Sequence, residues 1–163
     1  MSLLKNTIWK HITAAFGYVQ ASTADVETDI KRAYERTLSI NLSPSTNAVL
    51  NTTKRHIFRA YTNIDILAVH YVPDANLTAN ATNYATLTVY QGNGAAAAAT
   101  TVATLKTNAA NWVAGTPVAI TLSGTAANLV LEDGETLAAE ILKAGAGGVA
   151  VSQGSLVITY RER

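Results

Sequence analysis

The chain has 163 residues, a length that suits one folded domain with an extension. Hydrophobic residues make up 48% of it, which excludes disorder throughout, while charged residues make up only 14%. The net charge of +1 gives no basis for nucleic-acid binding, and the lack of cysteine excludes disulfides and thiolate chemistry. No apolar run approaches the roughly 18 residues of a membrane helix, so we expect no membrane partner.

Charge divides the chain into two unlike parts. Residues 1–60 carry eight basic and four acidic groups, for a net charge of +4. The remaining residues carry four basic and seven acidic groups, for a net charge of −3. Together with the periodicity described below, this asymmetry predicts an N-terminal arm over residues 1–53 and a β-domain over residues 54–163.

The arm lacks one consistent hydrophobic period. Apolar residues recur every four positions from Leu4 to Phe16, and residues 22–36 carry helix-cap signals, so two short helical pieces are predicted in an otherwise extended arm. Leu38, Ile40 and Leu42 then alternate with polar residues, which is the period of a strand. Short elements of mixed period cannot bury their apolar faces alone, so the arm needs another surface.

From residue 54 onward, the chain predicts strands separated by turn signals, at 57–61, 64–72, 84–91, 101–106, 118–122, 129–131, 135–143 and 155–161. Seven or eight such strands favour an all-β fold, an antiparallel β-sandwich or jelly roll. The strand over 64–72 is apolar on both faces, which predicts a central position. The expected core consists of Ile66, Leu67, Val69, Leu87, Val89, Val118, Ile120, Leu122, Leu137, Ile141, Leu156 and Ile158.

Motifs that carry chemistry are scarce. The three histidines, at positions 11, 56 and 70, have no metal-binding spacing, and Asp65 precedes His70 by five residues, which predicts opposite faces of one strand. The acidic run over residues 132–135 allows a calcium loop, but its Asp-Gly pair is more typical of a β-turn. Glycines at 145, 147 and 148 indicate a hairpin loop rather than a phosphate loop. We therefore expect no catalytic site, metal, cofactor or small-molecule substrate.

Protein contact is the remaining kind of function, and two groups of residues are candidates for it. Burying a large apolar side chain stabilises a protein by about 1.5–3 kcal/mol relative to leaving it in water. The apolar residues of the arm are therefore expected to cover an outer face or an edge of the β-domain, or a partner. A basic cluster at the start of the β-domain either binds an acidic partner surface or forms a charged lip where the arm joins the sheet. The predicted partner-binding residues are Leu4, Ile8, Trp9, Ile12, Phe16, Leu38, Ile40, Leu42, Lys54, Arg55 and Arg59.

Three stretches, Thr53–Ala60, Ile64–Leu87 and Gly154–Tyr160, resemble the β-domain of small structural proteins in tailed bacteriophage particles. The resemblance implies a capsid decoration, or cement, protein that binds the major capsid protein lattice and stabilises the head. It also implies a homotrimer on the outer shell, with N-terminal arms that reach neighbouring subunits. Such a protein is made in the host cytoplasm and ends on the capsid surface of the virion. The family has no sequence motif that assigns individual binding residues.

Two alternatives stay open at this point. In the first alternative, the chain is a head-fibre, neck or tail component of the same particle. In the second, it is a carbohydrate- or receptor-binding sandwich. The second alternative requires a platform of exposed aromatic rings, for which Tyr84, Tyr90 and Trp112 are the candidates.

Overall fold

The computed structural model describes residues 34–44, 54–92, 99–145 and 149–163. The chain divides into two compact units, Met1–Glu35 and Arg36–Arg163. The first predicted helix of the arm lies outside the described residues, as do residues 22–33 of the second and five predicted partner-binding residues: Leu4, Ile8, Trp9, Ile12 and Phe16. The last two residues of the second predicted helix, Glu35 and Arg36, begin a strand instead, so the helix was predicted too far along the chain.

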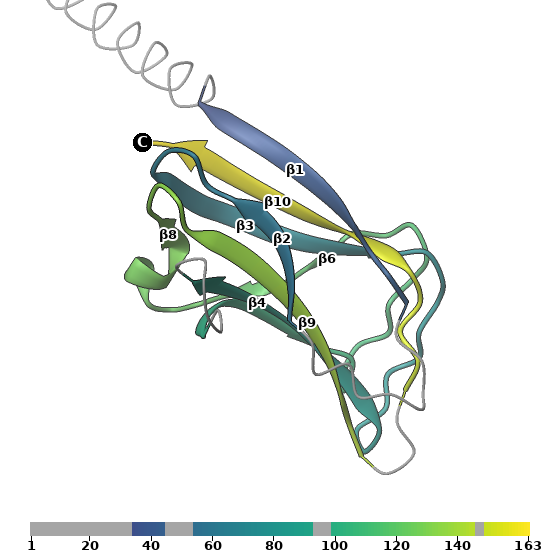
Figure 1. Ribbon diagram of the computed structural model, residues 1–163. Helices are drawn as coiled ribbons and strands as arrows, with labels where there is room; N and C mark the ends of the chain where they lie inside the picture. Colours follow the sequence, from purple (N-terminus) through teal and green to yellow (C-terminus); the bar gives the residue numbers. More distant parts are fainter. Residues whose placement is uncertain (1–33, 45–53, 93–98, 146–148) are drawn as a thin grey trace, which may run out of the picture. The chain divides into compact units, whose positions relative to one another are not determined.

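The described part of the chain forms two antiparallel sheets packed face to face (Figure 1). The first sheet contains β1 (Glu35–Leu42), β3 (Ile64–Pro73), β6 (Val118–Ala119), β8 (Val130–Leu131) and β10 (Gly154–Glu162). Its order is β1-β10-β3-β6, with β8 also paired to β3. The second sheet contains β2 (Arg55–Arg59), β4 (Tyr84–Gly92), β5 (Thr100–Lys106), β7 (Thr121–Leu122) and β9 (Thr136–Ala144), in the order β2-β9-β4-β5-β7. A 3-10 helix, η1 (Ala126–Leu129), precedes β8.

The predicted all-β sandwich is confirmed, and β3 has partners on both sides, as its apolar sequence predicted. The strand expected over 118–122 is instead two short strands in different sheets. β6 pairs with β3 and β7 pairs with β5, and between them the backbone N–H of Ile120 donates to the Val69 carbonyl at 2.8 Å. The chain therefore crosses from one sheet to the other at Ile120. Among the residues described, no helix is long and apolar enough to span a membrane.

The boundary predicted between residues 53 and 54 is wrong for the strand β1. This strand was assigned to the arm, but it pairs with β10 at the edge of the first sheet, and the compact unit begins at Arg36. Leu42 is buried in the core of the sandwich, and Ile40 packs against that core. The strand period was read correctly. The boundary was misplaced because the charge difference between the two parts of the chain was used to set it. Charge does not indicate whether a strand joins the sheet.

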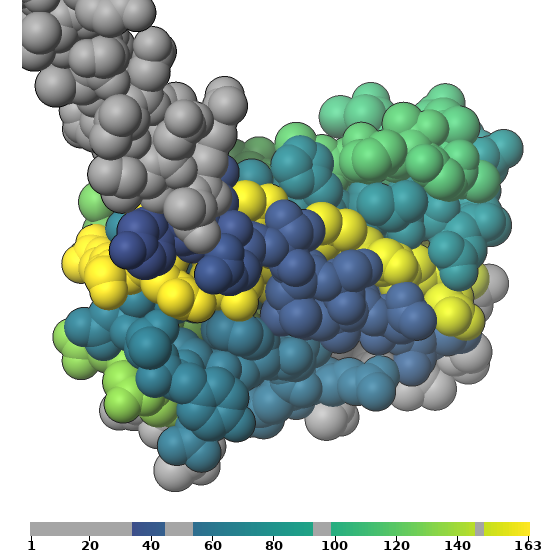
Figure 2. All heavy atoms as spheres, turned by 90° about the horizontal axis from the view of Figure 1, so that it is seen from above, coloured from purple at the N-terminus to yellow at the C-terminus, as the bar shows by residue number. Residues whose placement is uncertain are grey.

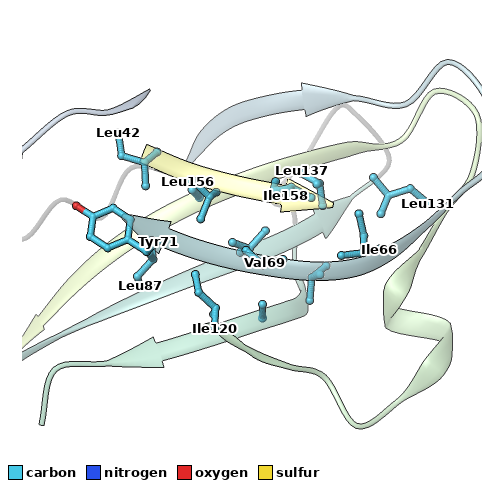
Figure 3. Close-up of a cluster of buried hydrophobic side chains, with 14 of the residues drawn as sticks. Leu42, Ile66, Val69, Tyr71, Leu87, Ile120, Leu131, Leu137, Leu156 and Ile158 are labelled. Atoms are coloured by element: carbon cyan, nitrogen blue, oxygen red, sulfur yellow. The ribbon is translucent and has the colours of Figure 1, made fainter. Parts of the chain in front are cut away.

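The core fills the space between the sheets (Figure 3). Eight of the twelve predicted core residues are buried: Ile66, Val69, Leu87, Val89, Ile120, Leu137, Leu156 and Ile158. The other four, Leu67, Val118, Leu122 and Ile141, are only partly buried. Large side chains that the prediction left out complete the core, chiefly Trp112, Tyr71, Ile64, Leu131, Val102 and Val151.

A β-bulge in β3 explains the misplaced Leu67. Thr159 of β10 pairs with Ala68 and the next residue, Tyr160, pairs with Ile66, so Leu67 has no partner in the ladder. The extra residue shifts the inward positions of β3 from the even to the odd residue numbers. Asp65 pairs with Arg161 and His70 with Val157, which lie four residues apart on β10 and therefore on one face. The prediction that Asp65 and His70 face opposite sides is wrong for this reason.

Candidate interaction surface

The two sheets have four edges, and the strands at these edges differ in length and charge. Three edge strands, β6, β7 and β8, contain two residues each. β2 has five residues, three of them Arg55, His56 and Arg59. β1 has eight residues, and from Thr37 to Leu42 none is charged. Short strands and charged side chains are the usual means of preventing unwanted strand pairing, so β1 is the edge that lacks this protection.

β1 and β2 lie on the same side of the sandwich (Figure 2). The Arg55 guanidinium, at the start of β2, donates from Nη1 to Ser43 Oγ, one residue past β1, at 3.0 Å. Arg55 pairs with Ala139, whose side chain is in the core, so the Arg55 side chain points toward the first sheet. We call the surface formed by Glu35–Leu42 and Arg55–Arg59 the β1–β2 side.

Apolar groups remain partly exposed along the β1–β2 side. Ile40, Ile57, Phe58 and Tyr160 pack against the core without being fully buried. The Phe58 and Tyr160 rings lie 5.5 Å apart, centroid to centroid, and join β2 to β10. Among the described strands, β1 is the last in its sheet, so this side of the sandwich offers both a strand edge and apolar contact area.

The structure separates the three basic residues that were predicted to act together. The Lys54 ammonium lies 4.1 Å from the centroid of the Tyr90 ring, on the outer face of the second sheet. Arg55 reaches toward Ser43, as described above. Arg59, at the far end of β2, lies near Tyr61 and beside the turn over residues 132–135. The predicted cluster is therefore spread along β2 instead of forming one patch.

Leu38, Ile40 and Leu42 also differ from their predicted role. All three face the interior side of β1, where Leu42 is buried and the other two are half-buried. Leu42 is a core residue of its own chain, so its assignment to a partner contact is wrong. Leu38 and Ile40 keep some exposed surface at the edge.

The turn over residues 132–135 carries three carboxylates. The Glu135 N–H donates to the Glu132 carbonyl at 3.1 Å, and a Glu135 carboxylate oxygen accepts from the Glu132 N–H at 2.9 Å. Gly134 has a φ of 88°, a left-handed conformation that glycine adopts without strain. The predicted β-turn is thus confirmed. Among the described residues, no group of three or more His, Asp and Glu side chains is placed to hold a metal ion.

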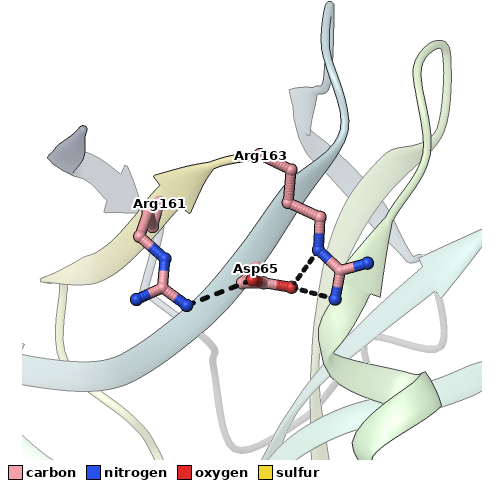
Figure 4. Close-up of polar contacts among 3 residues, drawn as sticks. All are labelled: Asp65, Arg161 and Arg163. Atoms are coloured by element: carbon pink, nitrogen blue, oxygen red, sulfur yellow. Dashed lines mark hydrogen bonds and ion pairs between the residues drawn. The ribbon is translucent and has the colours of Figure 1, made fainter. Parts of the chain in front are cut away.

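A second polar cluster joins the end of β10 to β3 (Figure 4). Arg161 Nη2 lies 3.3 Å from Asp65 Oδ2, and Arg163 Nε donates to Asp65 Oδ1 at 2.7 Å. The hydrogen bond from Arg163, aided by Arg161, lowers the pKa of Asp65 although burial opposes this. The cluster borders a shallow hollow of about 330 Å³ floored by apolar residues such as Leu67 and Leu129. Sequence reasoning missed it because β-sheet register, which no local pattern reveals, brings Asp65 and Arg161 together.

The structure removes one of the three rings that were predicted to form a sugar-binding platform. Trp112 is 1% exposed and packs in the core, 5.1 Å from the Tyr71 ring. Tyr90 is half-buried, with the Lys54 ammonium over its ring and its hydroxyl donating to Glu140 at 3.1 Å. Trp112 is therefore ruled out as a stacking residue, and the prediction that named it is corrected.

No family model and no curated protein matches the sequence. One solved structure, described as "Structure of infectious bursal disease virus Gx strain", matches with a TM-score of 0.35 and 17% identity. The match covers 78% of this chain and 32% of that chain, so the present chain spans about a third of that length.

Proposed function

We propose that the chain is a non-enzymatic structural protein of a virus particle, which binds the outer surface of the major capsid protein lattice and stabilises the head. The observation that carries this proposal is the β1–β2 side, where a strand edge without charge from Thr37 to Leu42 lies beside partly exposed apolar side chains. A surface of this kind suits contact with other protein subunits. The resemblance of the sequence to decoration proteins of tailed bacteriophages supplies the identity of the partner.

The composition supports the same role. With 14% charged residues and a net charge of +1, the chain has a surface rich in hydroxyl and amide groups. Such a surface packs against protein neighbours without the desolvation cost of many charges. It also provides little attraction for polyanions.

In the proposed role, residues preceding β1 act as a staple to neighbouring subunits. Because β1 belongs to the sandwich, a deletion that tests the arm must end before β1. Deleting residues 1–33 removes the arm and leaves β1 intact, whereas deleting residues 1–53 also removes an edge strand that covers β10. We expect the shorter deletion to preserve the sandwich while weakening attachment to capsids.

Co-sedimentation with capsids that lack the protein provides the experiment. The full chain is expected to pellet with the capsids in a saturable ratio, and the chain without residues 1–33 is expected to pellet less. Circular dichroism and thermal unfolding verify that the shortened chain is folded. Failure of the full chain to bind would contradict the proposal, and equal binding by a folded, shortened chain would remove the arm from it.

A further inference from the structure

A hollow beside the first sheet brings two arginines together with apolar side chains. It has a volume of about 330 Å³ and lies where β10, β3 and β8 are neighbours, because Asp65 pairs with Arg161 on one side and with Val130 on the other. Leu67 and Leu129 line the same hollow. We call it the Arg161 hollow, and it can contact a charged group and an apolar group at the same time.

Positive charge is in excess in the Arg161 hollow. Asp65 Oδ2 lies 3.3 Å from Arg161 Nη2, and Asp65 Oδ1 lies 2.7 Å from Arg163 Nε and 2.6 Å from its Nη2 (Figure 4). One carboxylate thus faces two guanidinium groups, each of which has more N–H donors than these contacts use. Glu162 follows Arg161 on β10, but strand alternation directs its side chain to the other face. Since the Arg161 and Arg163 side chains are 34% and 52% exposed, a second carboxylate can reach them.

The β-bulge in β3 supplies apolar surface to the hollow. It leaves Leu67 without a partner in the ladder, and this side chain is half-buried, two residues from Asp65. β-Bulges often occur next to functional sites, where they redirect a side chain. Asp65 already holds both arginines in one arrangement, which lowers the entropy cost of binding a ligand. The charged and the apolar parts of the hollow are therefore both in place before binding.

A neighbouring hollow limits the kind of anion that fits. It has a volume of about 280 Å³, is lined in part by Glu132 and Glu135, and shares Ala127 and Val130 with the Arg161 hollow. Although Arg59 lies beside the same turn, carboxylates outnumber it there, so this neighbourhood repels an extended polyanion. A single carboxylate beside an apolar group fits better, and a peptide segment with an acidic residue next to an aliphatic one has this chemistry.

We propose that the Arg161 hollow binds a segment of a partner protein in which a carboxylate lies next to an aliphatic side chain. The carboxylate bonds Arg161 and Arg163, and the aliphatic side chain packs on Leu67 and Leu129. The hollow shares no residue with the β1–β2 side. The binding is a property of the isolated chain and does not rest on attachment to capsids.

Amide NMR titration of the full chain with blocked tetrapeptides tests the proposal. The peptide Gly-Leu-Asp-Gly is expected to bind saturably and to shift the amide signals of Leu67, Leu129 and Arg161. Gly-Leu-Asn-Gly lacks the charge and Gly-Gly-Asp-Gly lacks the aliphatic group, so each is expected to bind at least about fivefold more weakly. Acetate provides the free anion, and acetate that binds as tightly as the first peptide would show that the hollow does not select a protein segment.

Two pairs of variants separate the charge of the hollow from its fold. Arg161→Gln is expected to narrow the difference between the Asp and Asn peptides. Lys106→Gln removes the same charge from the exposed end of β5 in the other sheet and is expected to bind like the wild type. Ala126→Glu places a carboxylate on an exposed residue of the hollow and leaves the contacts of Asp65 intact, so it is expected to block the Asp peptide more than Ala126→Gln does.

Thermal unfolding verifies that each variant is folded. Absence of saturable binding by the full chain would overturn the proposal. So would equal binding of the Asp and Asn peptides, or an Asp peptide that binds Arg161→Gln and Ala126→Glu as it binds the wild type.

Discussion

Asp65 is a charged group that links β3 to the end of β10. Its carboxylate bonds two arginines, and its pKa is lowered from the ordinary value of 3.8 chiefly by the hydrogen bond from Arg163. A carboxyl group whose pKa is lower in the folded state stabilises the fold above its unfolded pKa, and this contribution is lost as the pH falls through the folded pKa.

Asp65→Asn is therefore expected to lower the free energy of unfolding at neutral pH. The difference from the wild type should shrink as the pH falls from about 7 to about 3, where the wild-type carboxyl group is also losing its charge. Urea unfolding at several pH values measures it. A difference that does not change with pH would mean that Asp65 acts through packing and not through its charge.

Gly154 is a position where only glycine fits. A Cβ atom there would lie 2.6 Å from the Val72 carbonyl oxygen and closer still to the ring of Tyr71. Tyr71 cannot easily move, because it is buried, its hydroxyl donates to the Ser152 carbonyl at 3.0 Å, and burial raises its pKa to about 12. Gly154→Ala is expected to cost about 1–3 kcal/mol through overpacking.

Thermal unfolding of Gly154→Ala, compared with Gly124→Ala, measures this cost. Gly124 has no atom within 4 Å of the added Cβ and no left-handed φ, so its substitution controls for the loss of glycine itself. Equal stability of the two variants would show that β3 and β10 separate more readily than their register suggests.

Among the elements, β3 and β4 differ in how well the sequence predicts which side chains face the core, and the reason is the bulge in β3. In β4, Ala85, Leu87 and Val89 alternate without interruption, and all three are buried, Leu87 and Val89 as predicted. In β3, the run from Ile64 to Val72 is apolar at nearly every position, so the sequence gives no sign of where the phase changes. The bulge is set by pairing with β10, whose residues lie about 90 positions later in the chain.

This difference predicts unequal effects of the same substitution. Leu87→Ala removes a buried side chain and is expected to cost about 2–5 kcal/mol. Leu67→Ala removes a side chain that the bulge leaves half-exposed and is expected to cost about 1 kcal/mol. Chemical denaturation of both variants measures the difference. Similar losses would mean that Leu67 is a core residue, as the sequence alone suggests.

For the whole molecule, the sandwich was predictable because strand period and turn residues are local signals. The edge position of β1 was not predictable, because it depends on the order in which strands distant in sequence pair within the sheet. The same limit applies to Lys54, Arg55 and Arg59, which are close in sequence but lie in three different surroundings because of the alternation and the bulge of β2. The proposed partner-binding surface therefore emerges only from the order of strands in each sheet.

In the proposed role, this chain attaches to the outside of a capsid through contacts with other protein subunits. Cryo-electron microscopy of particles assembled with and without the chain is the sharpest test of this attachment. Additional density for a β-sandwich is expected on the outer surface of the shell, repeated over the lattice, with the β1–β2 side against neighbouring protein. Density confined to the neck or tail, or shells that are identical with and without the chain, would contradict it.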